Sequence, residues 1–126
     1  MVVMQTIYYR NIRGESLEEV STPRRGAWLS VTNPSKEELT ELEKKYKLDA
    51  DLLDDGIDLY ESPRIEHEEG NLYIYVRFNR PEGEYTSTHP LLIVVLPDML
   101  LTVSRIEPEP IRRLINTNKV ITTQKL

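Results

Sequence analysis

The sequence predicts one α/β domain of the α+β kind, with a mixed parallel and antiparallel sheet flanked by helices. Three observations lead to this fold class. Apolar side chains alternate with period two over residues 71–78, which is typical of a strand. Over residues 35–47 they recur at helical spacing instead. The chain of 126 residues has the length of a single domain, and it contains no internal repeat.

The first part of the chain is predicted to form two strands and a helix. Residues 2–9 and 27–32 are rich in β-branched and aromatic side chains, which favours strands. Ser35 and Glu38 have the spacing of a capping box, in which each side chain bonds to the other residue's main-chain N–H. A helix is therefore predicted from Ser35 to about Lys47.

A second, shorter helix is predicted directly afterwards. Asp49 is placed to cap it, and Leu52, Leu53 and Ile57 are expected to face inward. Gly56 is a poor residue for a helix interior, so we expect this helix to be short or irregular.

The strand predicted over residues 71–78 has two different faces. Tyr73 and Tyr75 lie on the less apolar face, where either a helix or a partner protein could cover them, and helix cover is the commoner case. The other face is apolar and carries Leu72, Ile74, Val76 and Phe78.

Two more strands and a helix complete the predicted order. A turn is expected at residues 81–83, which contain proline and glycine. The continuous apolar run 91–96 is typical of a strand covered on both faces. A turn at residues 97–98 then leads into a strand over 99–104, and Glu109 opens a last helix with Ile111, Leu114 and Ile115 inward. We expect the later strands to be antiparallel neighbours, because short turns join them.

Composition excludes several classes of protein. The chain has 16 basic and 21 acidic residues, a net charge of -5, which argues against nucleic acid as a partner. It has no cysteine, which fits a reducing cytoplasm and rules out thiolate metal sites and a cysteine nucleophile. The longest apolar run, 91–96, is far shorter than the roughly 20 residues of a membrane helix. No phosphate-binding glycine loop or nucleophile elbow is present, so no enzyme is predicted.

One acidic segment could bind a metal ion. Carboxylates are the ligands of hard cations, and Mg²⁺ takes one or two of them while keeping most of its water. The alternative interpretations are a solvated helix face with one or two caps and a carboxylate-based metal hydrolase. The segment contains Asp49, Asp51, Asp54, Asp55, Asp58 and Glu61.

The two histidines and the single tryptophan are interpreted as structural. His67 is expected at the surface near a strand start, because a zinc site needs three or four converging ligands. His89 precedes a proline and is expected in a loop. Trp28 is expected to anchor the core, and an exposed stacking platform is the alternative.

Several short motifs, taken together and in order, resemble the CorA family of magnesium transporters. The resemblance extends from about Trp28 to Ile115. The matching segments are residues 28–32 (WLSVT), 34–39 (PSKEEL), 48–55 (LDADLLDD), 63–66 (PRIE), 72–76 (LYIYV), 91–96 (LLIVVL) and 100–104 (LLTVS).

The resemblance implies a fold, a location and a function. Residues 1–126 would form a single cytoplasmic N-terminal domain of the α/β/α layered kind, a fragment without the family's stalk helix and two membrane helices. The full-length protein would be a homopentamer in the cell membrane that transports Mg²⁺ or Co²⁺, with this domain on the cytoplasmic face. The domain would sense intracellular cation at subunit boundaries and gate the pore, without enzymatic activity. The membrane would be contacted only through the missing C-terminal part.

The resemblance also implies a regulatory Mg²⁺ site formed by Asp55 with Asp54, whose opposing carboxylate belongs to the stalk helix of a neighbouring subunit. Ser62 and Gly56 stand where the family usually has arginine and an apolar residue, and Asp49-Ala50 replaces its His-Pro. A stand-alone acidic binding or regulatory module with the same fold is the alternative.

Overall fold

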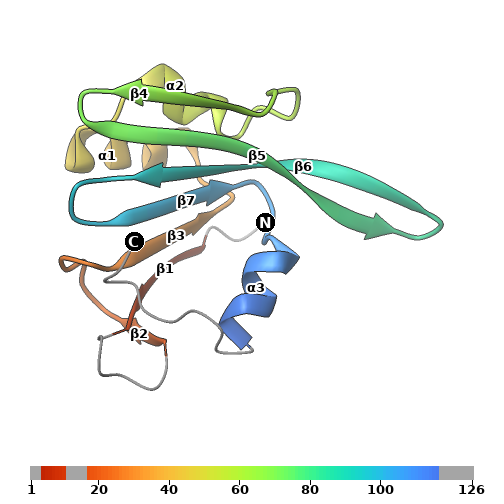
Figure 1. Cartoon of the computed structure of the whole chain (residues 1–126), viewed down its shortest axis with the longest axis horizontal. Helices are drawn as coiled ribbons and strands as arrows, with labels where there is room; N and C mark the ends of the chain where they lie inside the picture. Colours follow the sequence, from red (N-terminus) through yellow and green to blue (C-terminus); the bar gives the residue numbers. More distant parts are fainter. Residues whose placement is uncertain (1–3, 11–16, 117–126) are drawn as a thin grey trace.

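The described part of the chain forms a seven-stranded sheet with helices on its two faces (Figure 1). The structure, a computed structural model, describes residues 4–10 and 17–116, with only the main chain of Met4 and Leu114. The elements are β1 (Met4–Tyr9), β2 (Glu18–Val20), β3 (Trp28–Thr32), α1 (Lys36–Tyr46), α2 (Ala50–Asp55), β4 (Arg64–Glu68), β5 (Asn71–Glu82), β6 (Tyr85–Val95), β7 (Leu100–Ser104) and α3 (Glu109–Asn116).

The sheet is mixed, as predicted. Its strand order is β2-β1-β3-β7-β6-β5-β4. The central strands β3 and β7 are parallel, with Trp28 beside Leu100 and Thr32 beside Ser104. The other neighbouring strands of the described chain are antiparallel. The α+β class predicted from the sequence is confirmed.

Helix α1 forms where its local sequence predicts. Ser35 and Glu38 make both bonds of the capping box, and the Glu38 N–H donates to Ser35 Oγ over 3.2 Å. The helix ends at Lys47, which has a left-handed main chain. Leu39 and Leu42 are buried against the sheet, so the amphipathic pattern faces the core as expected.

The core lies between the sheet and the helices α1 and α2. Tyr73 and Tyr75 are buried there, so the expectation of helix cover is correct. Their hydroxyl groups both have partners on the α2 segment: the Asp49 N–H donates to Tyr73 Oη over 3.1 Å, and Tyr75 Oη donates to the Leu52 carbonyl. The strands contribute Leu29, Val31, Leu92, Val94, Leu101 and Val103 to the same core.

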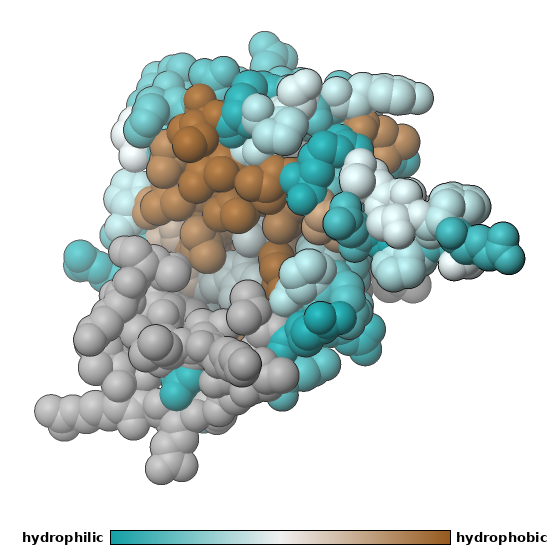
Figure 2. Space-filling model, turned by 45° about the vertical axis from the view of Figure 1, so that its right-hand side comes forward, coloured by the Kyte–Doolittle hydropathy of each residue, from teal (hydrophilic) through white to brown (hydrophobic). Residues whose placement is uncertain are grey.

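The opposite face of the sheet is covered in part by α3 and is otherwise open. Ile65, Ile74 and Ile93 are direct neighbours across β4, β5 and β6, and Ile65 is 63% exposed. Figure 2 shows apolar side chains gathered in one patch of the surface. The prediction that residues 91–96 are covered on both faces is correct only in part. Leu91 and Leu92, on opposite faces, are both buried, whereas Ile93 and Val95 on the side away from α1 and α2 are half-buried.

The structure also corrects the position of the turn predicted at residues 81–83. Strand β5 continues through Pro81 and Glu82, so the turn lies at Gly83 and Glu84 rather than at 81–83. Gly83 has a φ of 64°, which a residue without a side chain adopts easily. The outer part of this hairpin is polar, and its sequence therefore carries no alternation of the kind that reveals a strand. Strands β2 and β4 are short and were not predicted.

His89 belongs to β6 and not to a loop, which corrects another expectation. Its ring packs against Phe78 with centroids 5.8 Å apart, and its Nε2 lies 3.6 Å from a carboxylate oxygen of Glu82. The expectation for Trp28 is confirmed: its side chain is buried, and the indole N–H donates to Thr102 Oγ1 over 2.9 Å.

Some predictions lie outside the described residues, namely residues 2–3 of the first predicted strand and the side chain of Leu114. Across the described part of the chain, the helices are all too short or too polar to cross a lipid bilayer.

Candidate metal centre

The acidic segment is positioned by helix α2, which lies on the core side of the sheet. The Asp49 carboxylate caps the helix by accepting the Leu52 N–H over 3.0 Å. The helix ends at Gly56, which lies directly against β6: a Cβ atom there would be 2.6 Å from Leu92 Cδ2. This contact holds the end of α2 close to the sheet, and it explains why a glycine stands at this position.

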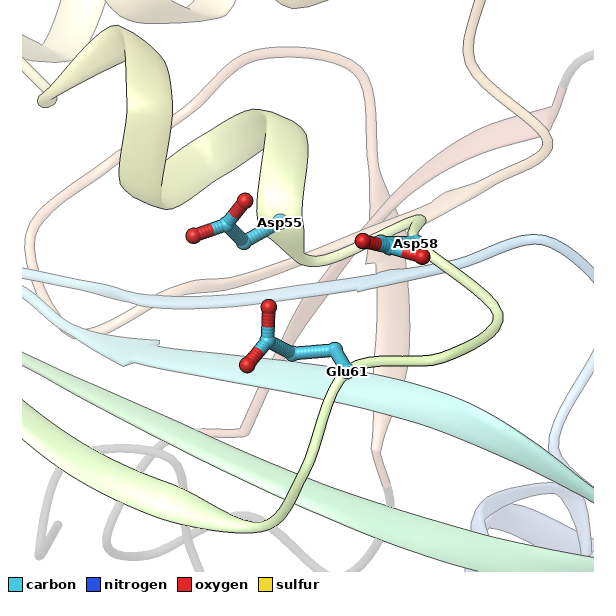
Figure 3. Close-up of side chains that lie close together, drawn as sticks. All are labelled: Asp55, Asp58 and Glu61. Atoms are coloured by element: carbon cyan, nitrogen blue, oxygen red, sulfur yellow. The ribbon is translucent and has the colours of Figure 1, made fainter.

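The chain then winds through consecutive turns that bring three carboxylates together. The Asp58 N–H donates to the Asp55 carbonyl over 3.2 Å, and the Glu61 N–H donates to the Asp58 carbonyl over 3.1 Å. As a result, one carboxylate oxygen each of Asp55, Asp58 and Glu61 lies within 4.8 Å of the other two. Figure 3 shows Asp55 at the end of α2 and Glu61 approaching it from the segment before β4. We call these three residues the acidic triad.

Arg64, at the start of β4, is the counter-ion of the triad. Its Nη2 lies 2.9 Å from Asp55 Oδ2, and its Nη1 forms an ion pair with Glu61. Its Nε lies 3.3 Å from Glu66 Oε1, and the guanidinium is stacked 4.1 Å from the centroid of the Tyr75 ring. One arginine therefore neutralises part of a charge cluster formed by four carboxylates.

The surroundings of Arg64 shift two pKa values. Burial lowers the pKa of the Arg64 guanidinium, but the hydrogen bond and negative charge of Asp55, together with Glu66, raise it by more. Burial also raises the pKa of the Tyr75 phenol well above its ordinary value, against the opposing effect of the Arg64 charge. At neutral pH, Arg64 is therefore charged and Tyr75 is a neutral hydrogen-bond donor.

The donor set of the triad suits a hard divalent cation. Three carboxylates with one oxygen each within 4.8 Å of the other two offer the kind of ligand that Mg²⁺ prefers, with water completing the shell. Asp55 and Glu61 share their oxygens with Arg64, whereas Asp58 accepts only the Tyr60 N–H in the described structure, over 2.9 Å. A carboxylate has about four lone-pair positions, so Asp58 and the remaining lone pairs of the other two residues could hold a hydrated ion.

The structure separates the two predicted metal ligands. Asp55 belongs to the acidic triad, whereas Asp54 is exposed and lies outside it. Metal binding by either residue stays a prediction. Arg64 was not predicted to contact Asp55, because nine residues separate them and no local spacing rule connects a helix end to a strand start. His67, on β4, is exposed as expected, and it belongs to no candidate metal group of the described residues.

The sequence matches the family described as CorA-like Mg²⁺ transporter protein over residues 24–125. The fold is similar to the complete structure of the CorA magnesium transporter from Methanocaldococcus jannaschii, with 25% identity and a TM-score of 0.73. That match covers 94% of this chain and 38% of the transporter. No curated protein gives a significant sequence match.

Two further solved structures have a similar fold. The soluble domain of CorA from Methanocaldococcus jannaschii matches at 23% identity and a TM-score of 0.75, over 100% of this chain and 51% of that one. The ZntB cytoplasmic domain from Vibrio parahaemolyticus RIMD 2210633 matches at 13% identity and a TM-score of 0.69, over 90% of this chain and 50% of that one. The chain thus spans about half of these two domains and less of the complete transporter.

Proposed function

Because the chain belongs to the family of CorA-like Mg²⁺ transporter proteins, we propose that it is the cytoplasmic domain with which a divalent cation transporter senses its cargo. In this proposal the transported ion is Mg²⁺ or Co²⁺, and the domain gates a pore formed by other parts of a homopentamer. It binds the regulatory ion and catalyses no reaction.

The acidic triad is the observation that carries this proposal. The three carboxylates of Asp55, Asp58 and Glu61 lie together at one partly exposed corner of the domain, and a single arginine neutralises only part of their charge. An acidic corner of this kind repels a similar corner on a neighbouring subunit unless a cation lies between them. A divalent ion between the two corners supplies the positive charge. We propose that Asp55 and the adjacent subunit bind this ion together.

Arg64 sets how strongly the triad responds to a cation. Its guanidinium forms ion pairs with Asp55 and Glu61, and we expect the domain to fold without metal. A cation must therefore compete with an internal partner for the same oxygens. This competition favours weak, reversible binding, and a sensor of an abundant ion requires binding of that strength.

The test uses the complete product of the gene, reconstituted in liposomes with this domain facing a solution of controlled Mg²⁺ concentration. We expect millimolar Mg²⁺ on that side to slow ion flux, and we expect Asp55→Asn to remove most of the inhibition because a shared ligand is lost. Asp51→Asn is the matched control, since Asp51 is exposed on α2 and lies outside the triad.

Three results would contradict the proposal. One is a complete gene product without a membrane-spanning segment, which would favour a stand-alone regulatory module. Another is flux that does not respond to Mg²⁺ on the side of the domain. The third is equal inhibition of the Asp55→Asn variant and the Asp51→Asn control.

A further inference from the structure

A second site candidate lies on the other side of the sheet from α1 and α2. A cavity of about 730 Å³ separates the outer part of the β5–β6 hairpin from α3. Its inner wall is formed by Thr32 and Asn33 at the end of β3 and by Arg105 and Ile106 just after β7. In Figure 1 the long hairpin and α3 are seen at the same end of the molecule. We call this cavity the hairpin groove.

The topology places the hairpin groove where the chain leaves two parallel strands. The Asn33 N–H donates to the Ser104 carbonyl over 2.8 Å, so the carboxyl ends of β3 and β7 are joined side by side. Beyond these ends the chain continues to different helices: β3 is followed by α1, and β7 is followed by α3.

The two helices lie on opposite faces of the sheet. Leu29 and Val31 of β3 pack in the core with α1, whereas Ser30 lines a small cavity together with Ile111 and Ile115 of α3. Since alternate residues of a strand point to opposite faces, α1 and α3 cover different sides. Ligands of open α/β sheets bind at this kind of position, outside the carboxyl ends of strands whose connections diverge.

The groove is rich in positive charge, although the whole chain carries a net charge of -5. Four arginines and two glutamates line it. Arg112 lies 3.5 Å from Glu107, and Arg113 lies 3.8 Å from Glu109, in two exposed ion pairs. The other two arginines, Arg80 and Arg105, form no ion pair with a described residue.

We propose that the hairpin groove binds a phosphate group carried by an anion of about the size of a nucleotide, either a free small molecule or a lipid headgroup. Arg80 lines the groove from the hairpin and Arg105 lines it from the segment after β7, so the groove offers an arginine on two of its sides for binding an anion. Arginine binds phosphate oxygens through paired N–H donors, and this geometry favours it over lysine at such sites. The volume falls within the range of small-molecule sites, about 300–1,000 Å³.

This site is independent of the acidic triad. The triad is formed by the end of α2 and the segment before β4, whereas the groove is formed by the hairpin, the end of β7 and α3. The triad attracts cations and the groove attracts anions, so each can be tested in a variant that leaves the other intact.

Binding is measured by isothermal titration of the chain with ADP and with inorganic pyrophosphate in the absence of divalent metal. A parallel arm uses sedimentation with phosphatidylglycerol vesicles, because a lipid headgroup presents the same phosphate chemistry at a membrane surface. We expect binding in at least one arm, and the arm that responds identifies the source of the phosphate. The double variant Arg80→Ala/Arg105→Ala is expected to bind at least tenfold more weakly in that arm.

Two further variants keep the result interpretable. Arg25→Ala removes one positive charge away from the groove, since Arg25 pairs with Asp98, and it is expected to leave binding unchanged. Glu107→Gln removes a competing negative charge from the groove and frees Arg112, so it is expected to tighten binding two- to fivefold. A damaged fold cannot produce tighter binding.

The proposal is wrong if neither arm shows binding to the unmodified chain. It is also wrong if the double variant binds as well as the unmodified chain, or if Arg25→Ala weakens binding as much as the double variant does. The last result would show attraction by overall charge rather than by the groove.

Discussion

Gly56 packs against Leu92 so closely that no side chain fits between them, since a Cβ atom would lie 2.6 Å from Leu92 Cδ2. We predict that Gly56→Ala lowers the free energy of unfolding by about 1–3 kcal/mol, the usual cost of overpacking. Helix propensity would predict the opposite sign. Urea denaturation measures the change. In the background of Leu92→Ala, which opens space, Gly56→Ala should cost much less, and equal costs in both backgrounds would contradict the packing argument.

The buried hydrogen bond from Trp28 to Thr102 leads to a second prediction. Trp28→Phe removes the indole donor and leaves the Thr102 hydroxyl without its partner, which we expect to cost about 1–3 kcal/mol of unfolding free energy. Thr102→Val is the matched change on the other side of the bond. The double variant should lose less than the sum of the single variants, and strict additivity in thermal or urea unfolding would show that the bond contributes nothing.

Tyr75 leads to a prediction about pH. Burial raises the pKa of its phenol in the folded state, so the folded protein holds this proton more tightly than the unfolded chain does. The bound phenol proton therefore stabilises the folded state fully at pH values below the unfolded pKa of about 10. This stabilisation is lost as the pH rises above that value. Tyr75→Phe should cost about 1 kcal/mol at pH 8, because the Leu52 carbonyl loses its donor, and this difference from the unmodified protein should shrink above pH 10. Tyr60→Phe is the control, since Tyr60 is 91% exposed. If the stability difference between Tyr75→Phe and the unmodified protein does not depend on pH, the role given to the Tyr75 phenol is wrong.

Arg64 leads to a prediction about metal. The unmodified chain should show little shift of its melting temperature in low millimolar Mg²⁺. Arg64 already neutralises part of the triad, and under the proposed function another subunit contributes a shared ligand. Arg64→Gln leaves the three carboxylates without this counter-ion and should lower the unfolding free energy by about 1 kcal/mol without metal. In this variant Mg²⁺ should restore several degrees of melting temperature.

The control for Arg64→Gln is Arg25→Gln, which removes an exposed arginine from the ion pair with Asp98 and should not create a Mg²⁺ response. If Mg²⁺ shifts the unmodified chain strongly and Asp55→Ala abolishes the shift, the triad forms a complete site within one chain. In that case the argument for a ligand shared between subunits is wrong.

The sequence alone determined the elements whose signals are local. The capping box of Ser35 and Glu38 marks the start of α1, since both of its bonds connect residues three positions apart. The alternation over residues 71–78 identifies β5 for a similar reason, because the period of a strand does not depend on its neighbours. Asp49 marks the start of α2, and Gly56 marks its end.

Only the tertiary structure decided which face of β5 enters the core. The sequence left either a helix or a partner protein to cover Tyr73 and Tyr75, and the structure buries both side chains under α1 and α2, where their hydroxyl groups bond to the α2 segment. The contact of Arg64 with Asp55 likewise depends on how α2 packs against the sheet. Such contacts join residues with no fixed spacing along the chain. They exist only after packing, and for that reason the sequence predicts the acidic segment but not the counter-ion that neutralises it.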